Sequence, residues 1–256
     1  MYKRQQLQQL VGIANSTDSN GNYLFGGYAS SAQPFAQSGN SVSYSGANGV
    51  DQIQISADQR ISGGDSGASV FMNIPAGNGT FTTAAASGNT GTASIDAGSV
   101  TNAAAWVPGT YSITFTSPTQ YQVTNSADTV VASGTYASPG TIAFDGVQVT
   151  VSGTPATGDT FTVAPAGTAS AFSTLSSLIS TLNSTTLNPG QLTTQISGAL
   201  EQIGSAITNI DNVQASVGAR LDAITSSQST AQSEQTDLQT SISQLSDCLL
   251  YTSRCV

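Results

Sequence analysis

The stretch Gly64-Asp65-Ser66-Gly67 is the part of this sequence that most resembles a catalytic motif. A serine there needs a neighbouring base to accept its proton at neutral pH, and the sequence contains no histidine. Asp65 could act only as half of a carboxylate pair that shares a proton, and no second Asp-Thr-Gly or Asp-Ser-Gly occurs, so a second copy would have to supply it. Gly-Gly-Asp-Ser-Gly is also ordinary turn sequence. We therefore predict a turn and no catalytic residue, and an aspartic protease is the least favoured alternative.

Three oxygen-bearing side chains near the N-terminus, Asp18, Asn20 and Asn22, have the alternate-residue spacing of the first ligands in a calcium loop. Such a loop also needs glycine at its sixth position and a bidentate glutamate at its twelfth. Those positions are Tyr23 and Ala29 here. The sequence therefore predicts a helix-terminating loop, because Asn, Asp, Ser and Gly favour turns. No metal site is expected, and no Gly-rich run ends in Gly-Lys-Ser/Thr, so no cofactor is expected either.

The composition excludes several classes of partner. Only 7% of the 256 residues are charged, where about 25% is usual, and the net charge is -9. Without a basic patch, nucleic acid and anionic membrane surfaces are unsuitable partners. No apolar run approaches the roughly 18 residues of a membrane span, and no apolar segment follows the first basic residues as in a secretory signal. Asn15-Ser16-Thr17 matches a glycosylation sequon, a short match that often arises by chance.

The two ends differ from the rest of the chain. They carry three of the five cationic residues and both cysteines: Lys3, Arg4, Arg254, Cys248 and Cys255. Codons for residues 2–5 and 248–251 can be complementary strands of one oligonucleotide, as in a sequencing adaptor. We therefore expect residues 1–5 and 248–256 not to be native, and residues 6–247 to be a fragment of a longer protein. Disulfide and zinc interpretations then fall away.

Hydrophobic periodicity predicts a helix, then strands. The i, i+3, i+4, i+7 pattern of one helical face is formed by Leu7, Leu10, Val11 and Ala14. A breaker-rich run at 15–22 ends that helix, and from about residue 40 the period changes to two. Half-buried strands are predicted around Val42, Tyr44, Ile53, Ile55, Tyr111, Ile113, Phe115, Tyr121, Val123, Ile142, Phe144, Val147, Val149, Val151, Phe161 and Val163. Asp145-Gly146 predicts a two-residue hairpin turn. The middle of the chain is expected to be a small antiparallel sandwich or barrel.

The last third of the chain predicts two helices. The first carries Phe172, Leu175, Leu178, Ile179 and Leu182, and Asn188-Pro189-Gly190 breaks it. The second has a 3,4 repeat, here called the apolar stripe, formed by Ile203, Ile207, Ile210, Val217, Leu221, Ile224, Ala231, Leu238, Ile242 and Leu245. Polar residues occupy three positions of this repeat, Gln214, Gln228 and Gln235. Such a stripe is typical of a coiled coil and must be covered by a partner helix. We expect the apolar face of residues 7–14 to cover it.

These elements predict an α+β fold in which a helical bundle or coiled coil, formed by the N- and C-terminal segments, carries an inserted antiparallel all-β domain. The expected divisions are residues 6–75, which hold the helix end and a β-hairpin part of the helical domain; residues 76–164, the inserted β domain; and residues 165–247, the helical return.

Several stretches resemble the flagellar hook-associated protein 3 family, the hook-filament junction proteins related to flagellin. The matching stretches are Asn22-Tyr23-Leu24-Phe25-Gly26-Gly27-Tyr28, Pro34-Phe35, Ser43-Tyr44-Ser45-Gly46, Gly64-Asp65-Ser66-Gly67-Ala68-Ser69-Val70-Phe71, Gly158-Asp159 with Phe161-Thr162-Val163, and Val217-Gly218-Ala219-Arg220-Leu221. The resemblance is strong over 7–75 and 158–247 and weak over 76–157.

The aromatic cluster in the first of these stretches also has a physical interpretation. Directly after a helix ends, we expect Tyr23, Phe25 and Tyr28 to fill the gap between the bundle and a β-hairpin. Gly26 and Gly27 would let the backbone turn closely there.

The resemblance implies a non-enzymatic structural subunit of the bacterial flagellum that forms the ring joining hook to filament. Its implied partners are other copies of itself, hook-associated protein 1 and flagellin. It implies an extracellular location after export by the flagellar type III apparatus, and termini that form an inner helical layer on assembly. The fragment itself is expected to be a soluble monomer.

Two alternatives stay open at this point. Flagellin shares the helical layout, and the Tyr-Leu-Phe-Gly-Gly-Tyr and Gly-Asp-Ser-Gly stretches argue against it. A secreted adhesin-like binding module would use the Thr/Ser/Gly-rich β region to contact a ligand, but such a module does not need a long heptad stripe.

Overall fold

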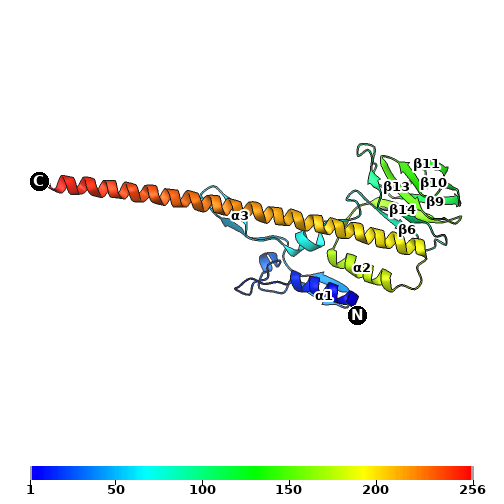
Figure 1. Ribbon diagram of the computed structural model, residues 1–256, viewed down its shortest axis with the longest axis horizontal. Helices are drawn as coiled ribbons and strands as arrows, with labels where there is room; N and C mark the ends of the chain where they lie inside the picture. The colour runs from blue at the N-terminus through cyan, green and yellow to red at the C-terminus, as the bar shows by residue number, and fades with distance from the viewer. Residues whose placement is uncertain (1, 255–256) are drawn as a thin grey trace.

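The protein is elongated, with a β-rich body at one end and one long helix that projects far beyond the other (Figure 1). This computed structural model describes the backbone of residues 2–254 and the side chains of residues 4–246. The expectation of foreign ends, residues 1–5 and 248–256, falls largely outside the described side chains. The helices are α1 (Tyr2–Ala14), α2 (Ala171–Asn183) and α3 (Pro189–Arg254), with a 3₁₀ turn η1 (Gly27–Ala29) and a π turn η2 (Ala68–Met72).

The β-rich body consists of two antiparallel sheets packed face to face. One has the strand order β11-β10-β9-β14-β6, and the other has the order β12-β13-β7, with β8 also pairing with β13. The strands are β6 (Phe81–Ala85), β7 (Ser94–Ile95), β8 (Ser99–Val100), β9 (Tyr111–Ser117), β10 (Gln120–Thr124), β11 (Val130–Thr135), β12 (Gly140–Phe144), β13 (Val147–Ser152) and β14 (Thr160–Pro165). The predicted antiparallel β region is therefore present as a sandwich, called the β sandwich below.

Alternation of buried and exposed side chains explains the β sandwich. In β9, for example, Tyr111, Ile113 and Phe115 are buried while the residues between them are at least partly exposed. Inward-facing residues of both sheets form one core. The predicted hairpin turn is confirmed, since Asp145 and Gly146 join β12 to β13 with positive φ angles of 40° and 78°.

Three two-stranded sheets lie outside the β sandwich, in the helical part of the molecule. They pair β1 (Phe35–Ser38) with β2 (Ser41–Tyr44), β3 (Gln52–Gln54) with β4 (Arg60–Ser62), and β5 (Ile74–Pro75) with β15 (Thr168–Ala169). The β5–β15 pair lies where the chain passes from the helical part into the sandwich and where it returns. A second core lies here, in which Phe35 contacts the rings of Tyr44, Phe71 and Phe172 at 4.9–5.7 Å. Phe25 meets Phe71 edge to face at 5.0 Å, as expected for a residue that fills this gap.

The expected partner of α1 is wrong. Leu7, Val11 and Ala14 are buried as the periodicity predicts, but α1 contacts α2 and β1, and its apolar face meets the aromatic core rather than the apolar stripe of α3. From α3, Val213 reaches this core. The apolar face of α1 therefore packs into the core that contains Phe35, Phe71 and Phe172.

Two expected burials are also wrong. Ile53 lies in a strand as predicted, yet its side chain is 52% exposed, because β3 is a three-residue strand whose side chains are all exposed. Tyr28 is 62% exposed, since the ring lies over Gly49 at the surface rather than in the core. Gly27 behaves as expected, with φ of +61° and the Ala47 and Gly49 carbonyl oxygens so close that no side chain could be accommodated.

Candidate interaction surface on helix α3

Helix α3 begins at a well-defined cap. The Asn188 side chain accepts the Gln191 N–H at 2.8 Å, and the Gln191 side chain accepts the Asn188 N–H at 3.1 Å, which is a reciprocal capping box. Pro189 occupies the first helical position, where its missing N–H costs nothing. The predicted break at Asn188-Pro189-Gly190 is thus the start of the long helix.

One face of α3 holds a row of polar side chains, here called the polar row, which bind the backbone of an earlier chain segment. The row consists of Gln191, Gln202, Asn209, Arg220 and Ser227. Their partners, in the same order, are backbone groups at residues 86–87, 75–77, 69–70, 62–64 and 55. Spacings of 11 and 7 residues return to the same side of a helix. The segment 55–87 therefore runs antiparallel along α3 and is fixed to it at five points.

The strongest of these attachments joins two of the stretches that resemble the hook-associated family. The Arg220 guanidinium forms an ion pair with the Asp65 carboxylate and donates to the carbonyl oxygens of Ser62 and Gly64 at 3.2 and 2.9 Å. The Arg220 side chain is 15% exposed. Ser66 accepts the Ser69 N–H at 3.2 Å as the chain enters η2. The stretch that resembled a catalytic motif is thus a loop bound to α3.

The N-terminal end of α3 is fixed to the β sandwich by a partly buried hydrogen-bond network. Asn188 donates to the carbonyl oxygen of Asn89 at 2.7 Å, and Asn89 exchanges side-chain hydrogen bonds with the Thr160 backbone. The buried Asp159 carboxylate accepts N–H groups from residues 90, 91 and 156. The α3 N-terminus and the sandwich therefore form one continuous structure.

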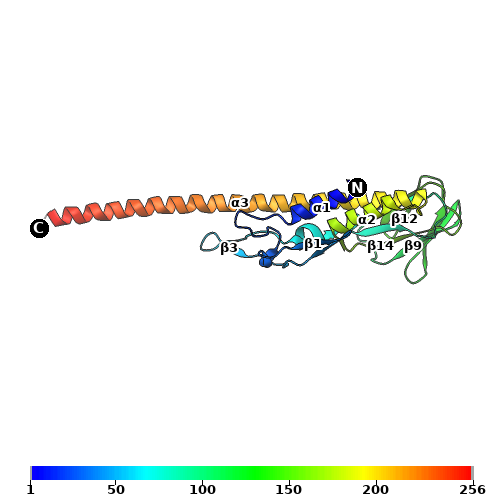
Figure 2. The same ribbon diagram turned by 90° about the horizontal axis from the view of Figure 1, so that it is seen from below.

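The apolar stripe is largely uncovered, both along the attached part of α3 and past it. Its residues Ile207, Val217, Leu221, Ile224, Leu238, Ile242 and Leu245 are 40–64% exposed. Past Ser227, α3 projects from the body with no neighbouring element along its described length (Figures 1 and 2). An apolar face of this length is unusual on a protein that functions alone, and marks an interaction surface.

The described charged side chains of α3 are mostly carboxylates. Its exposed carboxylates are Glu201, Asp211, Asp222, Glu234 and Asp237, and none of them has an ion-pair partner in the described part of the chain. Arg220 is the one cation among the described side chains of α3, and Asp65 neutralises it. The uncovered part of the helix is therefore apolar and acidic.

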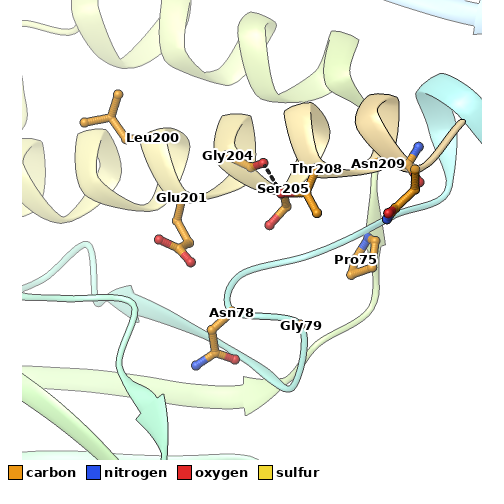
Figure 3. A pocket seen from close by; sticks show the side chains of 10 residues that line it. Pro75, Asn78, Gly79, Leu200, Glu201, Gly204, Ser205, Thr208 and Asn209 are labelled. Atoms are coloured by element: carbon orange, nitrogen blue, oxygen red, sulfur yellow. Dashed lines mark hydrogen bonds between the residues drawn. The ribbon is translucent and has the colours of Figure 1, made fainter. Parts of the chain in front are cut away.

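A shallow hollow of about 340 Å³ lies where the β5–β6 turn meets α3 (Figure 3). Pro75, Asn78, Leu200, Glu201 and Ser205 line it. Glu201 is its one carboxylate, and no group of three or more metal-ligating residues occurs in the described chain. The hollow gives no sign of a catalytic or metal site.

The stretch with calcium-like spacing is a tight turn. The Asp18 carboxylate accepts the N–H groups of Asn20 and Asn22 at 2.8 and 2.9 Å. The hydrogen bond from Asn22 lowers the pKa of Asp18, because it stabilises the ionised form. The loop prediction is confirmed. The nearby sequon residue Asn15 exchanges both amide hydrogen bonds with the Phe35 backbone, which ties the end of α1 to β1.

Sequence reasoning missed the polar row and the environment of Trp106. Gln and Asn on a helix are normally expected to face solvent. Only the regular spacing of the polar row, Gln191, Gln202, Asn209 and Arg220, could have indicated that these side chains bind the same chain segment. Trp106 packs against the rings of Phe81 and Tyr111 at 5.8 and 5.6 Å, although the sequence around it has weak periodicity. Among the described residues, no helix is both long enough and apolar enough to cross a bilayer.

Solved structures resemble this chain over nearly its whole length. FlgL of Xanthomonas campestris is 33% identical, with a TM-score of 0.85, covering 94% of this chain and 79% of that one. Flagellar hook-associated protein 3 of Legionella pneumophila is 31% identical, with a TM-score of 0.90, covering 96% of this chain and 80% of that one. A second Legionella structure is described as the flagellar junction protein FlgL, 33% identical, with a TM-score of 0.80 over 88% of this chain and 78% of that one.

Sequence comparisons agree over shorter stretches. The model for the D2-like domain of flagellar hook-associated protein 1 matches residues 84–165, which lie in the β sandwich. Flagellar hook-associated protein 3 of Salmonella typhimurium is 39% identical over 66 residues, 26% of this chain. The match spans 20% of the length of that curated relative.

Proposed function

This chain belongs to the flagellar hook-associated protein 3 family, and on that basis we propose that it is a structural subunit of the bacterial flagellum that joins hook to filament. The observation that carries the proposal is the uncovered apolar stripe on a helix that is otherwise firmly attached to the body. A stripe of this length is covered when the subunit assembles, since an exposed apolar face of several heptads costs free energy in water.

The proposal includes the partners, location and organisation of the subunit. Other copies would form a ring with it, and hook-associated protein 1 and flagellin would contact that ring from either side. The subunit would act outside the cell after export by the flagellar type III apparatus. Residues 76–164 would be an inserted outer domain, carried by a helical domain made of residues 6–75 and 165–247. This division is supported by the β5–β15 pair, which lies between the two regions.

A catalytic role is not part of the proposal. The Asp65 carboxylate, the strongest candidate acid in the sequence, is ion-paired with Arg220 and so is not available to share a proton with a second carboxylate. Ser66 has no base beside it, and its side-chain oxygen accepts a backbone N–H.

Complementation tests the proposal. The full-length gene is introduced into a bacterium that lacks its own hook-associated protein 3, with Leu238→Gln, Ile242→Gln and Leu245→Gln combined. We expect normal protein levels, shed flagellin and loss of swimming. The matched control places glutamine at three positions on the far side of the same helix, Ser226, Ser233 and Thr240, and should swim. Swimming restored by the stripe variant would refute the proposal.

A further inference from the structure

One of the three Asn-Gly pairs in this chain differs from the other two in what its side chain and the following N–H contact. The pairs are Asn20-Gly21, Asn48-Gly49 and Asn78-Gly79. We propose that Asn48 is a site of spontaneous modification, at which the folded protein converts its own asparagine into aspartate and isoaspartate. The inference goes beyond the proposed function and does not depend on it.

The reaction consumes water and releases ammonia. The Gly49 backbone nitrogen loses its proton to hydroxide and attacks the side-chain carbon Cγ of Asn48, so that a new C–N bond closes a succinimide ring. The bond from Cγ to the amide nitrogen Nδ2 breaks, and that nitrogen takes a proton from water and leaves as ammonia. One water molecule then opens the ring at either carbonyl, which gives aspartate or isoaspartate. Nothing is oxidised or reduced.

The first argument is that the attacking nitrogen is free. A hydrogen bond donated by the N–H stabilises the protonated form of the nitrogen and so opposes the attack. The Gly49 N–H has no acceptor among the described residues. The Gly21 N–H donates to the Asp18 carbonyl oxygen at 3.1 Å, and the Gly79 N–H donates to the Ala76 carbonyl oxygen at 3.0 Å. The middle pair is therefore the one of the three with an unengaged nucleophile.

The second argument concerns the carbon that is attacked. Asn48 is exposed, and its side chain has no hydrogen-bond partner in the described part of the chain, so it is free to turn toward the next nitrogen. The Asn78 side chain (Figure 3) instead donates to the carbonyl oxygens of residues 97 and 98 and accepts the N–H groups of residues 80 and 81, all at 2.9–3.2 Å. Its amide is fixed on both sides and should resist the reaction.

Asn20-Gly21 is the intermediate case. The Asn20 side chain is exposed and has no partner among the described residues, as at position 48. The Asp18 carboxylate, however, accepts the Asn20 N–H at 2.8 Å and also lies close to the Gly21 N–H. A negative charge there disfavours the anion that forms when the Gly21 nitrogen loses its proton. This pair should therefore react more slowly than the pair at 48–49.

The fold itself requires glycine after Asn48. A Cβ at position 49 would lie 2.2 Å from the Tyr28 ring, so no larger residue that would hinder the attack fits there. The Gly49 carbonyl oxygen accepts the Tyr28 N–H at 2.9 Å, and the Ala47 N–H donates to the Gly26 carbonyl oxygen at 2.9 Å. Isoaspartate would lengthen the main chain between these two attachments by the former side-chain carbon. The conversion should therefore loosen both hydrogen bonds.

Incubation of the full chain at pH 8.5 and 37 °C, followed by peptide mass mapping, tests the inference. Each conversion adds about 1 Da, and methylation by an isoaspartyl methyltransferase identifies isoaspartate. We expect Asn48 to convert at least about tenfold faster than Asn78 and about fivefold faster than Asn20. The matched control is the same chain in concentrated guanidinium chloride, where the folded contacts are lost and the three rates should agree within about threefold.

Two variants test the assignment further. Asn48→Gln should remove the fast conversion and leave the other two rates unchanged. Asp18→Ala should accelerate the conversion at Asn20 about threefold without affecting Asn48. Equal rates for the three pairs in the folded chain would overturn the inference. A preference for Asn48 that persists in guanidinium chloride would also overturn it, because local sequence and not the fold would then select the site.

Amide hydrogen exchange measures the consequence of the modification. The isoaspartate form is separated from the unmodified chain by ion exchange, since it carries one more negative charge. Exchange of the Tyr28 and Ala47 amides should be at least about tenfold faster in the isoaspartate form, while exchange in the β sandwich stays the same. Unchanged exchange at both amides would refute the expected loosening.

Discussion

The β sandwich and the outer half of α3 differ in how far their apolar side chains are buried. In the sandwich, the inward-facing side chains of both sheets, such as Phe115, Phe161 and Ile113, are fully buried by other residues of the same chain. On α3, Leu238, Ile242 and Leu245 are 63–64% exposed. The sandwich therefore derives its stability from within the chain, while the stripe can gain burial only from a partner. A regular apolar pattern whose side chains stay exposed therefore indicates an assembly surface and not a part of the chain's own core.

The largest expected effect compares one truncation in each region. Phe115 is fully buried and packs on the rings of Tyr136 and Phe161, so Phe115→Ala should destabilise the sandwich by about 3–5 kcal/mol. Leu238→Ala should change stability by less than about 0.5 kcal/mol. Urea titration followed by the fluorescence of the single tryptophan, Trp106, measures the first effect, and circular dichroism at 222 nm the second. Equal losses in the two variants would remove the contrast between the regions.

The second effect concerns the part of α3 that is covered. Arg220→Ala removes an ion pair and two hydrogen bonds to carbonyl oxygens, and should cost about 1–3 kcal/mol of local stability. Amide hydrogen exchange should accelerate in residues 52–65 and stay unchanged in the sandwich. Arg220→Lys should rescue part of the protection, because lysine keeps the charge but cannot reproduce the planar donor geometry. Unchanged exchange would mean that the hairpin is held by other contacts.

The third effect is a pH dependence confined to the sandwich. Burial, and then the hydrogen bond to Asp145, raise the pKa of Tyr111 to about 12. The unfolded chain loses the phenol proton near pH 10 while the folded chain keeps it, so stability is constant with respect to this group below pH 10 and falls up to pH 12. The slope is at most about 1.4 kcal/mol per pH unit. Denaturation at pH 9, 10.5 and 11.5 measures it, and Tyr111→Phe should flatten the profile.

The smallest effect is a polar substitution in the stripe. The 3,4 repeat predicts that Leu221 is covered by a partner helix. The side chain is 57% exposed, so Leu221→Asp should change the free energy of unfolding by less than about 1 kcal/mol, mostly through helix propensity. Thermal unfolding of the purified chain checks this. A loss of several kcal/mol would show that the stripe is covered in solution.

How far the sequence predicts this structure differs between regions. Most strands from 111 to 165 are predictable because apolar and polar residues alternate cleanly, and β11, which has no buried side chain, is the exception. Strands between 76 and 110 are not predictable, because β7 and β8 have two residues each and β6 buries only Phe81. The helix bounds follow from capping and breaker residues such as Asn188 and Pro189. The stripe's periodicity correctly predicts a long helix but does not say what covers it.

The attachments of α3 are the least predictable feature. Arg220 and Asp65 are 155 residues apart in the sequence. The residue types around Arg220 are typical of a solvent-exposed helix face, and those around Asp65 are typical of a turn. Their meeting depends on the antiparallel course of residues 55–87 along α3. Local patterns carry no information about such a course.

The straightness of α3 has a geometric consequence for whatever binds it. The helix runs nearly straight in both views (Figures 1 and 2), so it has about 3.6 residues per turn, whereas its apolar stripe repeats every 3.5. The stripe therefore drifts by roughly 20° per heptad, and by about 100° over the five heptads from Ile210 to Leu245. A straight partner helix packed along α3 would no longer contact the stripe after two or three heptads. Anything that follows the whole stripe must coil around α3 in a left-handed sense, so the handedness of that joint is already encoded in a single unpaired helix.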